Sequence, residues 1–343
     1  MRAIQHSTYG TAAEVLHLVD DAPIPVPGAG EILVRVHATS VNPIDCAVRG
    51  GYGAAYWEKI GFVKQPHIPG RDVAGTVAAL GEGVTGYTPG DAVWAGTLSG
   101  GTADYMAIPA DWAAPAPPSL SFAEAGSIPY AILTAWAALV DHAGLTPENA
   151  AGKRVVVPRG AGGVGSLAIQ LLKAWGAEVA TIVSTRNVDL VRELGADTVI
   201  DYTRQDFADH LHGYDVAFDT SFDVEDKLLG ALKTGADAAY VSIVTPKLLL
   251  IDRHGLEEGL ARGEALFAER VAAQKALGRR YAWAFMKPNG EALRIVGDLV
   301  RAGRIRPVID RVLPMTEMVA AHEYCESRQA RGKIVIDVAG TPA

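Results

Sequence analysis

The chain has 343 residues, of which 49% are apolar and 20% charged, and its 31 basic and 39 acidic residues give a net charge of −8. This is the composition of a globular protein with room for two domains, and it excludes a disordered, collagen-like or coiled-coil chain. The acidic balance gives no electrostatic reason to bind nucleic acid or an anionic membrane. No run approaches the roughly 20 apolar residues of a membrane span, and two cysteines exclude a disulfide framework. Since the first residues also lack the apolar stretch of a secretory signal, we expect a cytoplasmic protein.

The first third of the chain has the pattern of short strands separated by turns. Residues Glu31–Ala38 alternate between apolar and polar side chains, and Val73–Leu80 and Asp91–Ala95 are two further candidate strands. Glycine and proline recur between these segments, as they do in turns. The pattern predicts a barrel-like, β-rich domain.

The pattern changes near Ser119. Residues Ser119–Val140 are alanine-rich with helical spacing, and Ser121 followed by Glu124 fits the capping box that starts a helix. From Gly152 onward, strands and helices alternate, which predicts a parallel sheet with helices on its faces. The expected strands are Arg154–Val157, Glu178–Val183, Thr198–Ile200, Val216–Asp219 and Ala238–Val244, and the expected helices are Val164–Trp175 and Val188–Leu194.

The remaining residues complete the expected organisation. Long helices are expected at Leu256–Leu277 and Gly290–Ala302, and strands at Pro307–Ile309 and Ile334–Val338. The fold class is therefore α/β. We expect a β-rich domain of residues 1–126, a doubly wound parallel-sheet domain of residues 127–287, and a segment of residues 288–343 that returns to the first domain.

A glycine-rich turn carries the clearest chemical signal. The segment Gly160-Ala161-Gly162-Gly163-Val164-Gly165 fits the G-x-G-x-x-G pattern and lies between an expected strand and an expected helix. Such a turn lets the backbone approach a pyrophosphate, and the N–H groups at the start of the helix then bind the phosphates. A glycine-rich turn without a ligand is the alternative, and the strand–turn–helix context favours the dinucleotide site.

The residues after the second strand of this domain discriminate between the two nicotinamide cofactors. An NAD site places an acidic residue there to bind the ribose hydroxyls, but here the strand is followed by Ser184 and Arg186. A hydroxyl and a guanidinium suit the 2′-phosphate of NADPH. Tyr202, after the third strand, is a candidate wall of the adenosine pocket. The alternatives are a solvated arginine and a partly buried aromatic ring.

Several motifs together resemble a known family, the medium-chain dehydrogenases/reductases. In the first half the motifs are Val41–Asp45, Pro69–Val77 and Gly90–Val93, and in the second they are Leu133–Trp136, the glycine turn and Leu194–Tyr202. The sequence is most similar to the zinc-independent quinone oxidoreductase branch, which includes zeta-crystallin. Within that branch it resembles the group of reticulon-4-interacting oxidoreductases, through Arg49–Gly53, Val244–Pro246, Tyr281–Phe285, Ile305–Ile309 and Ala330–Lys333.

The resemblance implies a fold, a cofactor and a reaction. It implies a GroES-like domain and a Rossmann domain that binds NADPH, and the reduction of quinones or α,β-unsaturated carbonyl compounds. In the zinc-dependent relatives, cysteine, histidine and glutamate hold a catalytic zinc. Here Asn42, Arg71 and Asp72 stand at the similar positions, and an arginine cannot ligate zinc. We therefore expect no metal.

The resemblance also suggests residues for the reaction. Tyr52 is a candidate proton donor to a developing enolate, and Asn42 is a candidate partner of the substrate carbonyl or the nicotinamide ribose. The alternatives are a packed loop aromatic and an ordinary turn residue before a proline. Thr134, Tyr281 and Phe285 are candidate contacts of the nicotinamide, and each could instead be structural. Lys333 is expected to be solvated rather than to reach the cofactor.

Other functions fit the same sequence. A glycine turn reports binding rather than chemistry, so an NADPH-binding structural or redox-sensing protein with little turnover is one alternative. A zinc-type alcohol dehydrogenase is another. A homodimer is expected from the resemblance alone.

Overall fold

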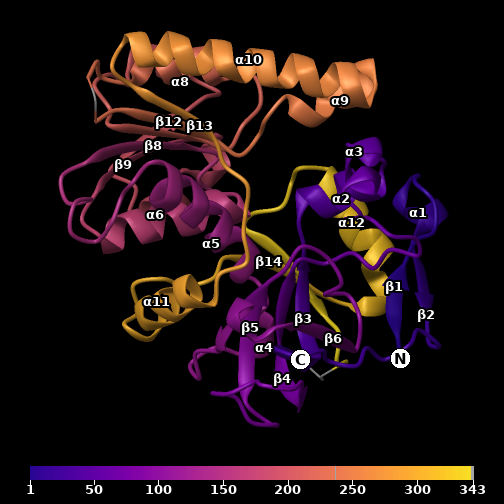
Figure 1. The fold of residues 1–343 in the computed structure, drawn as a ribbon. Coiled ribbons are helices and arrows are strands. Elements are labelled where there is room, and N and C mark those ends of the chain that lie inside the picture. Colours follow the sequence, from indigo (N-terminus) through magenta and orange to yellow (C-terminus); the bar gives the residue numbers. More distant parts are fainter. Residues whose placement is uncertain (236, 341–343) are drawn as a thin grey trace. The chain divides into compact units, whose positions relative to one another are not determined.

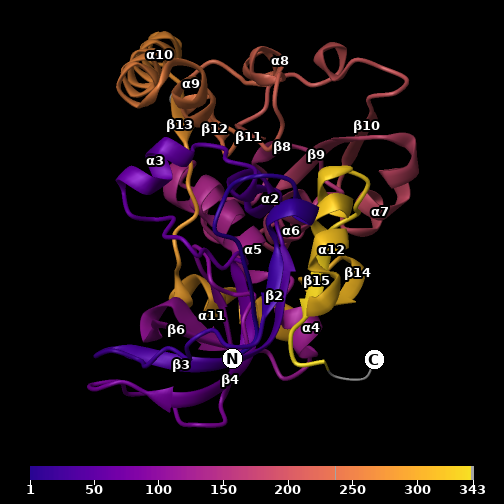
Figure 2. The same ribbon diagram turned by 90° about the vertical axis from the view of Figure 1, so that its right-hand side faces the viewer.

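A computed structural model describes residues 1–235 and 237–340 of the chain, which forms two compact units. The first unit is discontinuous, because it combines Met1–Leu133 with the segment from Lys287 onward. The second unit is the continuous segment Thr134–Met286. Each unit has its own sheet (Figures 1 and 2).

The first unit is built around a seven-stranded sheet with the order β14-β15-β3-β4-β5-β7, in which β6 also pairs with β3. A separate antiparallel pair, β1 and β2, lies near the N-terminus. The strands of this unit are β1 (Ala3–Gln5), β2 (His17–Val19), β3 (Glu31–Val41), β4 (Asp72–Leu80), β5 (Ala92–Gly96), β6 (Tyr105–Pro109), β7 (Ala113–Pro115), β14 (Ile309–Pro314) and β15 (Lys333–Asp337). Its helices are α1 (Ala12–Val15), α2 (Pro43–Arg49), α3 (Ala54–Lys59), α4 (Phe122–Ala125), α11 (Gly290–Arg301) and α12 (Met318–Glu326).

The C-terminal strand joins this sheet by pairing with β3. The antiparallel register matches Ile334 with Val41 and Val335 with Ser40. The apolar residues of both strands enter one core, in which Ile32, Val34 and Ile336 are at most 2% exposed. Two strands that are almost 300 residues apart in sequence are therefore hydrogen-bonded neighbours in one sheet.

The second unit is a six-stranded parallel sheet with the order β10-β9-β8-β11-β12-β13. Helices α8 and α10 cover one face and α6 covers the other (Figures 1 and 2). The strands are β8 (Arg154–Pro158), β9 (Glu178–Val183), β10 (Thr198–Asp201), β11 (Val216–Asp219), β12 (Ala239–Ser242) and β13 (Arg280–Trp283). The helices are α6 (Gly163–Ala174), α7 (Val188–Glu193), α8 (Glu225–Ala231), α9 (Lys247–His254) and α10 (Leu256–Ala276).

This topology confirms the predicted fold class and contains the kind of position at which parallel sheets bind ligands. The strand order reverses between β8 and β11, and in open parallel sheets ligands bind outside the carboxyl ends of the strands at such a point. The glycine turn follows β8 directly. The strand–turn–helix context expected for it is thus present.

The helix expected over Ser119–Val140 is interrupted. It consists of α4, which starts with the predicted Ser121–Glu124 capping box, then α5 (Pro129–Trp136), and then a π-helical turn of residues 137–142. The break has two physical causes. Gly126 lies against the backbone of Ala38, where an added Cβ would be 3.0 Å from the carbonyl oxygen. In addition, Pro129 disfavours helical geometry at the residue before it.

Two further sequence expectations need adjustment. The strand expected at Pro307–Ile309 begins only at Ile309 and continues to Pro314 as β14. Within the described residues, 122–142 is a stretch long and apolar enough by composition to cross a membrane, although the sequence predicted none. Its apolar window is 72% buried inside the protein, which is the condition of a core helix.

Candidate functional site

The glycine turn of the second unit has the geometry of a phosphate cradle. The three pattern glycines differ in the space around them. A Cβ on Gly160 would clash with the Thr181 hydroxyl, and a Cβ on Gly165 would be 2.5 Å from the Arg159 carbonyl oxygen. A Cβ on Gly162 would meet only that same oxygen, at 3.3 Å. The first and third glycines thus permit close packing, and the second leaves its backbone open to a ligand.

The rest of the turn prepares the start of helix α6. Gly162 is the N-cap, and its carbonyl accepts the N–H of Ser166 at 2.9 Å. Gly163 and Val164 follow in the first turn of the helix, where N–H groups lack intrahelical acceptors. Ala161 is buried at 5% exposure and holds the turn against the core. The residues present therefore fit the pyrophosphate of a dinucleotide.

The predicted adenosine contacts lie at the carboxyl ends of the two neighbouring strands. Ser184 follows β9, and Arg186 is exposed in the short 3-10 turn after it. The Asn187 side chain donates to the Ser184 hydroxyl at 3.3 Å. Tyr202 follows β10, its ring is 60% exposed, and its N–H donates to the Val183 carbonyl. The sheet therefore brings all three residues to the edge that carries the glycine turn.

The three residues predicted to contact the nicotinamide lie in different environments. Thr134 is buried on α5, and Phe285, which follows β13, is 50% exposed. Tyr281 lies in the middle of β13 rather than at its carboxyl end. Its ring stacks on Tyr240 at 5.0 Å, and its hydroxyl contacts Glu225 at 3.2 Å. The structure thus makes Tyr281 a core residue and does not bring it to the glycine turn.

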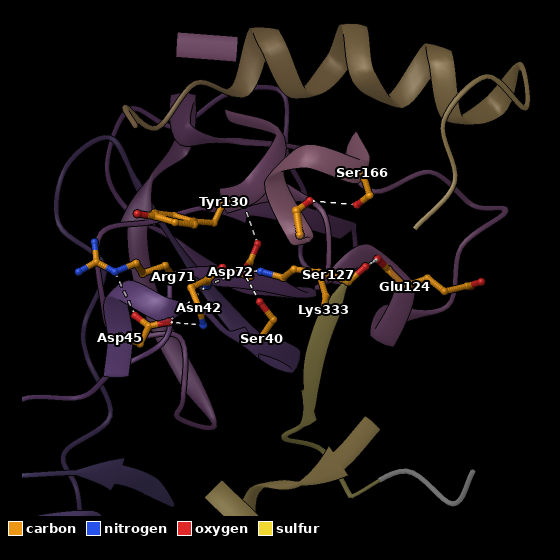
Figure 3. A network of polar contacts seen from close by, with 11 residues as sticks. Ser40, Asn42, Asp45, Arg71, Asp72, Glu124, Ser127, Tyr130, Ser166 and Lys333 are labelled. Atoms are coloured by element: carbon orange, nitrogen blue, oxygen red, sulfur yellow. Dashed lines mark hydrogen bonds and ion pairs between the residues drawn. The ribbon is translucent and has the colours of Figure 1, made fainter. Parts of the chain in front are cut away.

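A buried polar network in the first unit contains Asn42 and Lys333, two further residues that the sequence analysis considered (Figure 3). Its centre is Asp72, which is fully buried at the start of β4. The Asp72 carboxylate accepts hydrogen bonds from the Ser40 hydroxyl, from the Asn42 amide at 3.1 Å and from the N–H of Tyr130 at 2.7 Å. It also forms an ion pair with the ammonium of Lys333 at 3.3 Å.

Lys333 is buried, not solvated as the sequence suggested. It is 5% exposed, and its ammonium donates to the Asn42 side-chain oxygen as well as pairing with Asp72. The cause is the strand register, because the pairing of Ile334 with Val41 places Lys333 beside the next residue, Asn42. A buried ammonium requires a paired charge, and Asp72 supplies it.

Asn42 joins this ion pair to a second one. It is the N-cap of α2, and its amide nitrogen donates to Asp72 and, at 3.3 Å, to Asp45. Asp45 in turn pairs with the Arg71 guanidinium at 3.0 Å, with both side chains at most 6% exposed. Burial raises the pKa of Asp45, and the charge of Arg71 opposes that rise. Two carboxylates thus balance two cations, with the Asn42 amide between them.

This arrangement defines what Asn42 does in the first unit. Its amide nitrogen and its oxygen are both engaged within the network, and the side chain is 4% exposed. Asn42 therefore positions Asp72 and Lys333, and its contact with a substrate or cofactor stays a prediction. Tyr52 lies outside the network, in the turn after α2, where its carbonyl accepts the Trp57 indole N–H at 3.0 Å.

The network does not suit a zinc ion. Zinc ligands are thiolates, imidazoles and carboxylates, but both carboxylates here already pair with a lysine or an arginine, which cannot ligate a metal. Over the part of the chain that the structure describes, no group of three or more histidine, cysteine, aspartate and glutamate side chains is placed to hold a metal. The donor set at this site is therefore that of a charge-balanced hydrogen-bond network.

Sequence reasoning missed several members of this network. A local signal existed for Asp45, since Asn42-Pro43-Ile44-Asp45 has the form of a helix N-terminus with an acidic residue at the third position. No local signal existed for the pair of Asp72 and Lys333, which are 261 residues apart. The participation of Ser40 and Tyr130 likewise depends on the folded ladder and on the start of α5.

Comparison with known proteins places this architecture in a family. Residues 28–118 match the family described as alcohol dehydrogenase GroES-like domain, and residues 194–336 match the family described as zinc-binding dehydrogenase. The NAD(P)H oxidoreductase RTN4IP1, mitochondrial, of Danio rerio is 37% identical over 95% of this chain and 88% of that protein. The NADPH-dependent alkenal/one oxidoreductase, chloroplastic, of Arabidopsis thaliana is 32% identical over 98% of this chain and 79% of that protein.

A solved structure agrees with these relatives. The quinone oxidoreductase from Coxiella burnetii superposes with a TM-score of 0.81 at 32% identity, covering 98% of this chain and 99% of that one. The resemblance noted from the sequence motifs is thus confirmed. This chain belongs to the medium-chain dehydrogenase/reductase superfamily of NAD(P)H-dependent oxidoreductases, with a GroES-like domain and a Rossmann-type domain.

Proposed function

We propose that this chain is an NADPH-dependent reductase of quinones or α,β-unsaturated carbonyl compounds that works without zinc. The observation that carries the proposal is the buried network of Asp72, Lys333 and Asn42, which puts an ammonium in a site whose residues do not suit a metal. The relatives named for alkenal/one and quinone reduction support the acceptor class.

The chain's own residues divide the work between cofactor and acceptor. The backbone N–H groups after Gly162 hold the pyrophosphate, and Arg186 with Ser184 binds the 2′-phosphate of NADPH. When bound, the nicotinamide supplies a hydride. Asp72 and Lys333 keep the first unit's site rigid and neutral, so it binds an uncharged acceptor without leaving a buried charge unpaired.

The reaction class follows from what the site can stabilise. Reduction of an isolated carbonyl leaves a localised alkoxide, which usually requires a Lewis acid such as zinc. Hydride addition to an enone or a quinone spreads the negative charge over a conjugated system, and hydrogen-bond donors suffice to stabilise it. A metal-free site therefore favours conjugated acceptors.

Absorbance of the reduced nicotinamide tests the proposal. The purified protein is mixed with NADPH or NADH and with a panel of ortho-quinones, para-quinones, enones and simple aldehydes, in the presence of a chelator. We expect oxidation with conjugated acceptors, faster with NADPH than with NADH, and none with simple aldehydes. Tight NADPH binding without turnover on any acceptor would favour an NADPH-binding protein instead, and activity abolished by the chelator would favour an alcohol dehydrogenase. A cytoplasmic location is a further proposal from the sequence, and a homodimer is a further proposal from the family resemblance.

A further inference from the structure

Tyr130 extends from the buried network alongside a cation. It is the second residue of α5, and its backbone N–H is fixed to Asp72 at 2.7 Å. The guanidinium carbon of Arg71 lies 5.5 Å from the centre of the Tyr130 ring, and the two side chains extend in the same direction from the network (Figure 3). Phe62 packs against the same guanidinium, at 5.3 Å.

The Arg71 guanidinium acts directly on the phenol. Burial raises the pKa of Tyr130, and the charges of Asp45 and Asp72 add to that rise, whereas the positive charge of Arg71 and a hydrogen bond from its guanidinium to the phenol oxygen oppose it. Arg71 is itself fixed by its ion pair with Asp45 at 3.0 Å. A fixed cation at the phenol oxygen stabilises the phenolate that forms when the proton leaves.

The hydroxyls of three other tyrosines of the first unit donate to protein oxygens. The hydroxyl of Tyr9 donates to Glu58 at 2.9 Å, that of Tyr87 to the Ala113 carbonyl at 2.7 Å, and that of Tyr324 to Asp310 at 2.6 Å. An acceptor that holds the proton makes a phenol a poorer acid. Arginines also act on Tyr87 and Tyr324, but Arg294 and Arg311 are exposed, whereas the Arg71 guanidinium beside Tyr130 is buried and held by Asp45.

The position of Tyr130 on its helix also fits a role in the reaction. Tyr130 and Thr134 are four residues apart on α5, so their side chains lie on the same face of the helix, one turn apart. Thr134 is the residue of this helix predicted to contact the nicotinamide. Tyr52, the proton donor predicted from the family resemblance, lies in a separate turn after α2.

We propose that Tyr130 is the catalytic acid of the reaction, and that Arg71 stabilises its phenolate. This inference rests on the proposed function. The acceptor gains a hydride at its β-carbon, and the electron pair of its double bond moves to form an enolate. The O–H bond of Tyr130 then breaks, its proton passes to the enolate, and the electron pair stays on the phenol oxygen as phenolate beside Arg71. A water molecule reprotonates the phenolate and leaves as hydroxide.

The test compares two kinds of acceptor with Tyr130→Phe. With an aliphatic enone, whose enolate must be protonated in the site, kcat should fall about 100-fold. With a para-quinone, whose hydroquinone anion can take its proton from water after release, kcat should change less than about threefold. The variant lacks only a hydroxyl, and retained NADPH affinity and quinone turnover show that it is folded. Tyr324→Phe, which removes a phenol hydroxyl elsewhere in the same unit, is the matched control.

The possible outcomes distinguish failure of the proposed function from failure of the assignment of Tyr130. Absence of turnover by the unaltered protein with every quinone and enone overturns the proposed function. Turnover by the unaltered protein, with equal enone activity in Tyr130→Phe, overturns the assignment of Tyr130 while the proposed function stands. Loss of enone activity in Tyr52→Phe but not in Tyr130→Phe also overturns the assignment of Tyr130, in favour of Tyr52. Loss of enone activity alone in Tyr130→Phe supports it.

Discussion

A single buried lysine accounts for much of the first unit's chemistry. Lys333 pairs with Asp72 and donates to Asn42, and all three residues are at most 5% exposed. Removal of one partner from a buried ion pair leaves an uncompensated charge, and this costs far more than the intact pair contributes. The ammonium is therefore a structural requirement for the carboxylate beside it.

The first prediction follows from this pairing. Lys333→Met should lower the free energy of unfolding by about 3–5 kcal/mol, because Asp72 is left buried without its cation. The double variant Lys333→Met, Asp72→Asn should recover at least half of the loss. Denaturant unfolding measures both, with Lys64→Met as a control at an exposed position. Equal stability of Lys333→Met and the unaltered chain would show that Lys333 is not the partner of Asp72.

Arg186 carries the second prediction at the residue scale. Because a guanidinium and a phosphate form a charge-assisted pair, Arg186→Ala should weaken NADPH binding about tenfold, or about 1.4 kcal/mol. NADH, which lacks the 2′-phosphate, should bind nearly as before. Titration of both cofactors by protein fluorescence checks this, with the exposed Arg192→Ala as the matched control. Equal losses for both cofactors would remove the 2′-phosphate assignment.

At the scale of elements, the six-residue glycine turn contains one glycine that is needed for packing and another that leaves room for the ligand. Gly165 is packed against the Arg159 carbonyl, whereas Gly162 has an open Cβ direction and a backbone geometry that alanine also adopts. The two glycines therefore serve different ends, one for packing and one for the ligand.

The third prediction compares alanine at these two positions. Gly162→Ala should leave the unfolding midpoint within about 2 °C of the unaltered chain and weaken NADPH binding at least about tenfold, since its methyl group occupies space reserved for the pyrophosphate. Gly165→Ala should lower the unfolding midpoint itself, because its methyl group lies 2.5 Å from a carbonyl oxygen. Thermal unfolding with and without NADPH measures both effects. Undiminished NADPH binding by Gly162→Ala would contradict the cradle.

At the scale of the whole molecule, buried histidines give the first unit a dependence on pH. Burial lowers the pKa of His322 to about 3 and that of His67 to about 4. Arg49 and His6 add to the effect on His322, whose two ring nitrogens have no hydrogen-bond partner. As the pH falls, these imidazoles bind protons in the unfolded chain before they do so in the folded protein. Their contribution to stability is therefore fully present above pH 6.5 and is lost as the pH falls toward 3.

The fourth prediction isolates one of these histidines. Between pH 6.5 and pH 5, His322→Leu should lose about 2 kcal/mol less stability than the unaltered chain. At pH 7.5 it should be at least as stable, because an unpaired buried imidazole is replaced by an apolar group. In the second unit, Asp219 changes the stability with pH in the opposite direction. Burial raises its pKa to about 6, so its protonation favours the folded protein as the pH falls. Urea unfolding at several pH values measures the difference between the two proteins. Parallel pH curves would show that His322 is not the group that titrates.

The sequence was sufficient for features that depend on neighbouring residues and insufficient for those that depend on strand register. The strand–turn–helix around Gly160 was predictable because its signal lies within a short segment. The burial of Lys333 was not, because it results from the pairing of β15 with β3. The core position of Tyr281 likewise depends on which face of β13 its side chain joins. Motifs thus identified the cofactor, and only the fold assembled the charge network.

Transfer of deuterium from labelled NADPH tests the central claim most directly. The chelator-treated protein, with its metal content measured, is incubated with NADPH labelled at C4 of the nicotinamide and with an aliphatic enone, and the product is analysed by mass spectrometry. Both C4 faces are labelled in separate samples. We predict one deuterium at the β-carbon of the saturated product from one of the two labelled cofactors, in protein free of zinc. Product formation only after zinc is restored, or no deuterium from either cofactor, would contradict a metal-free hydride transfer by this chain.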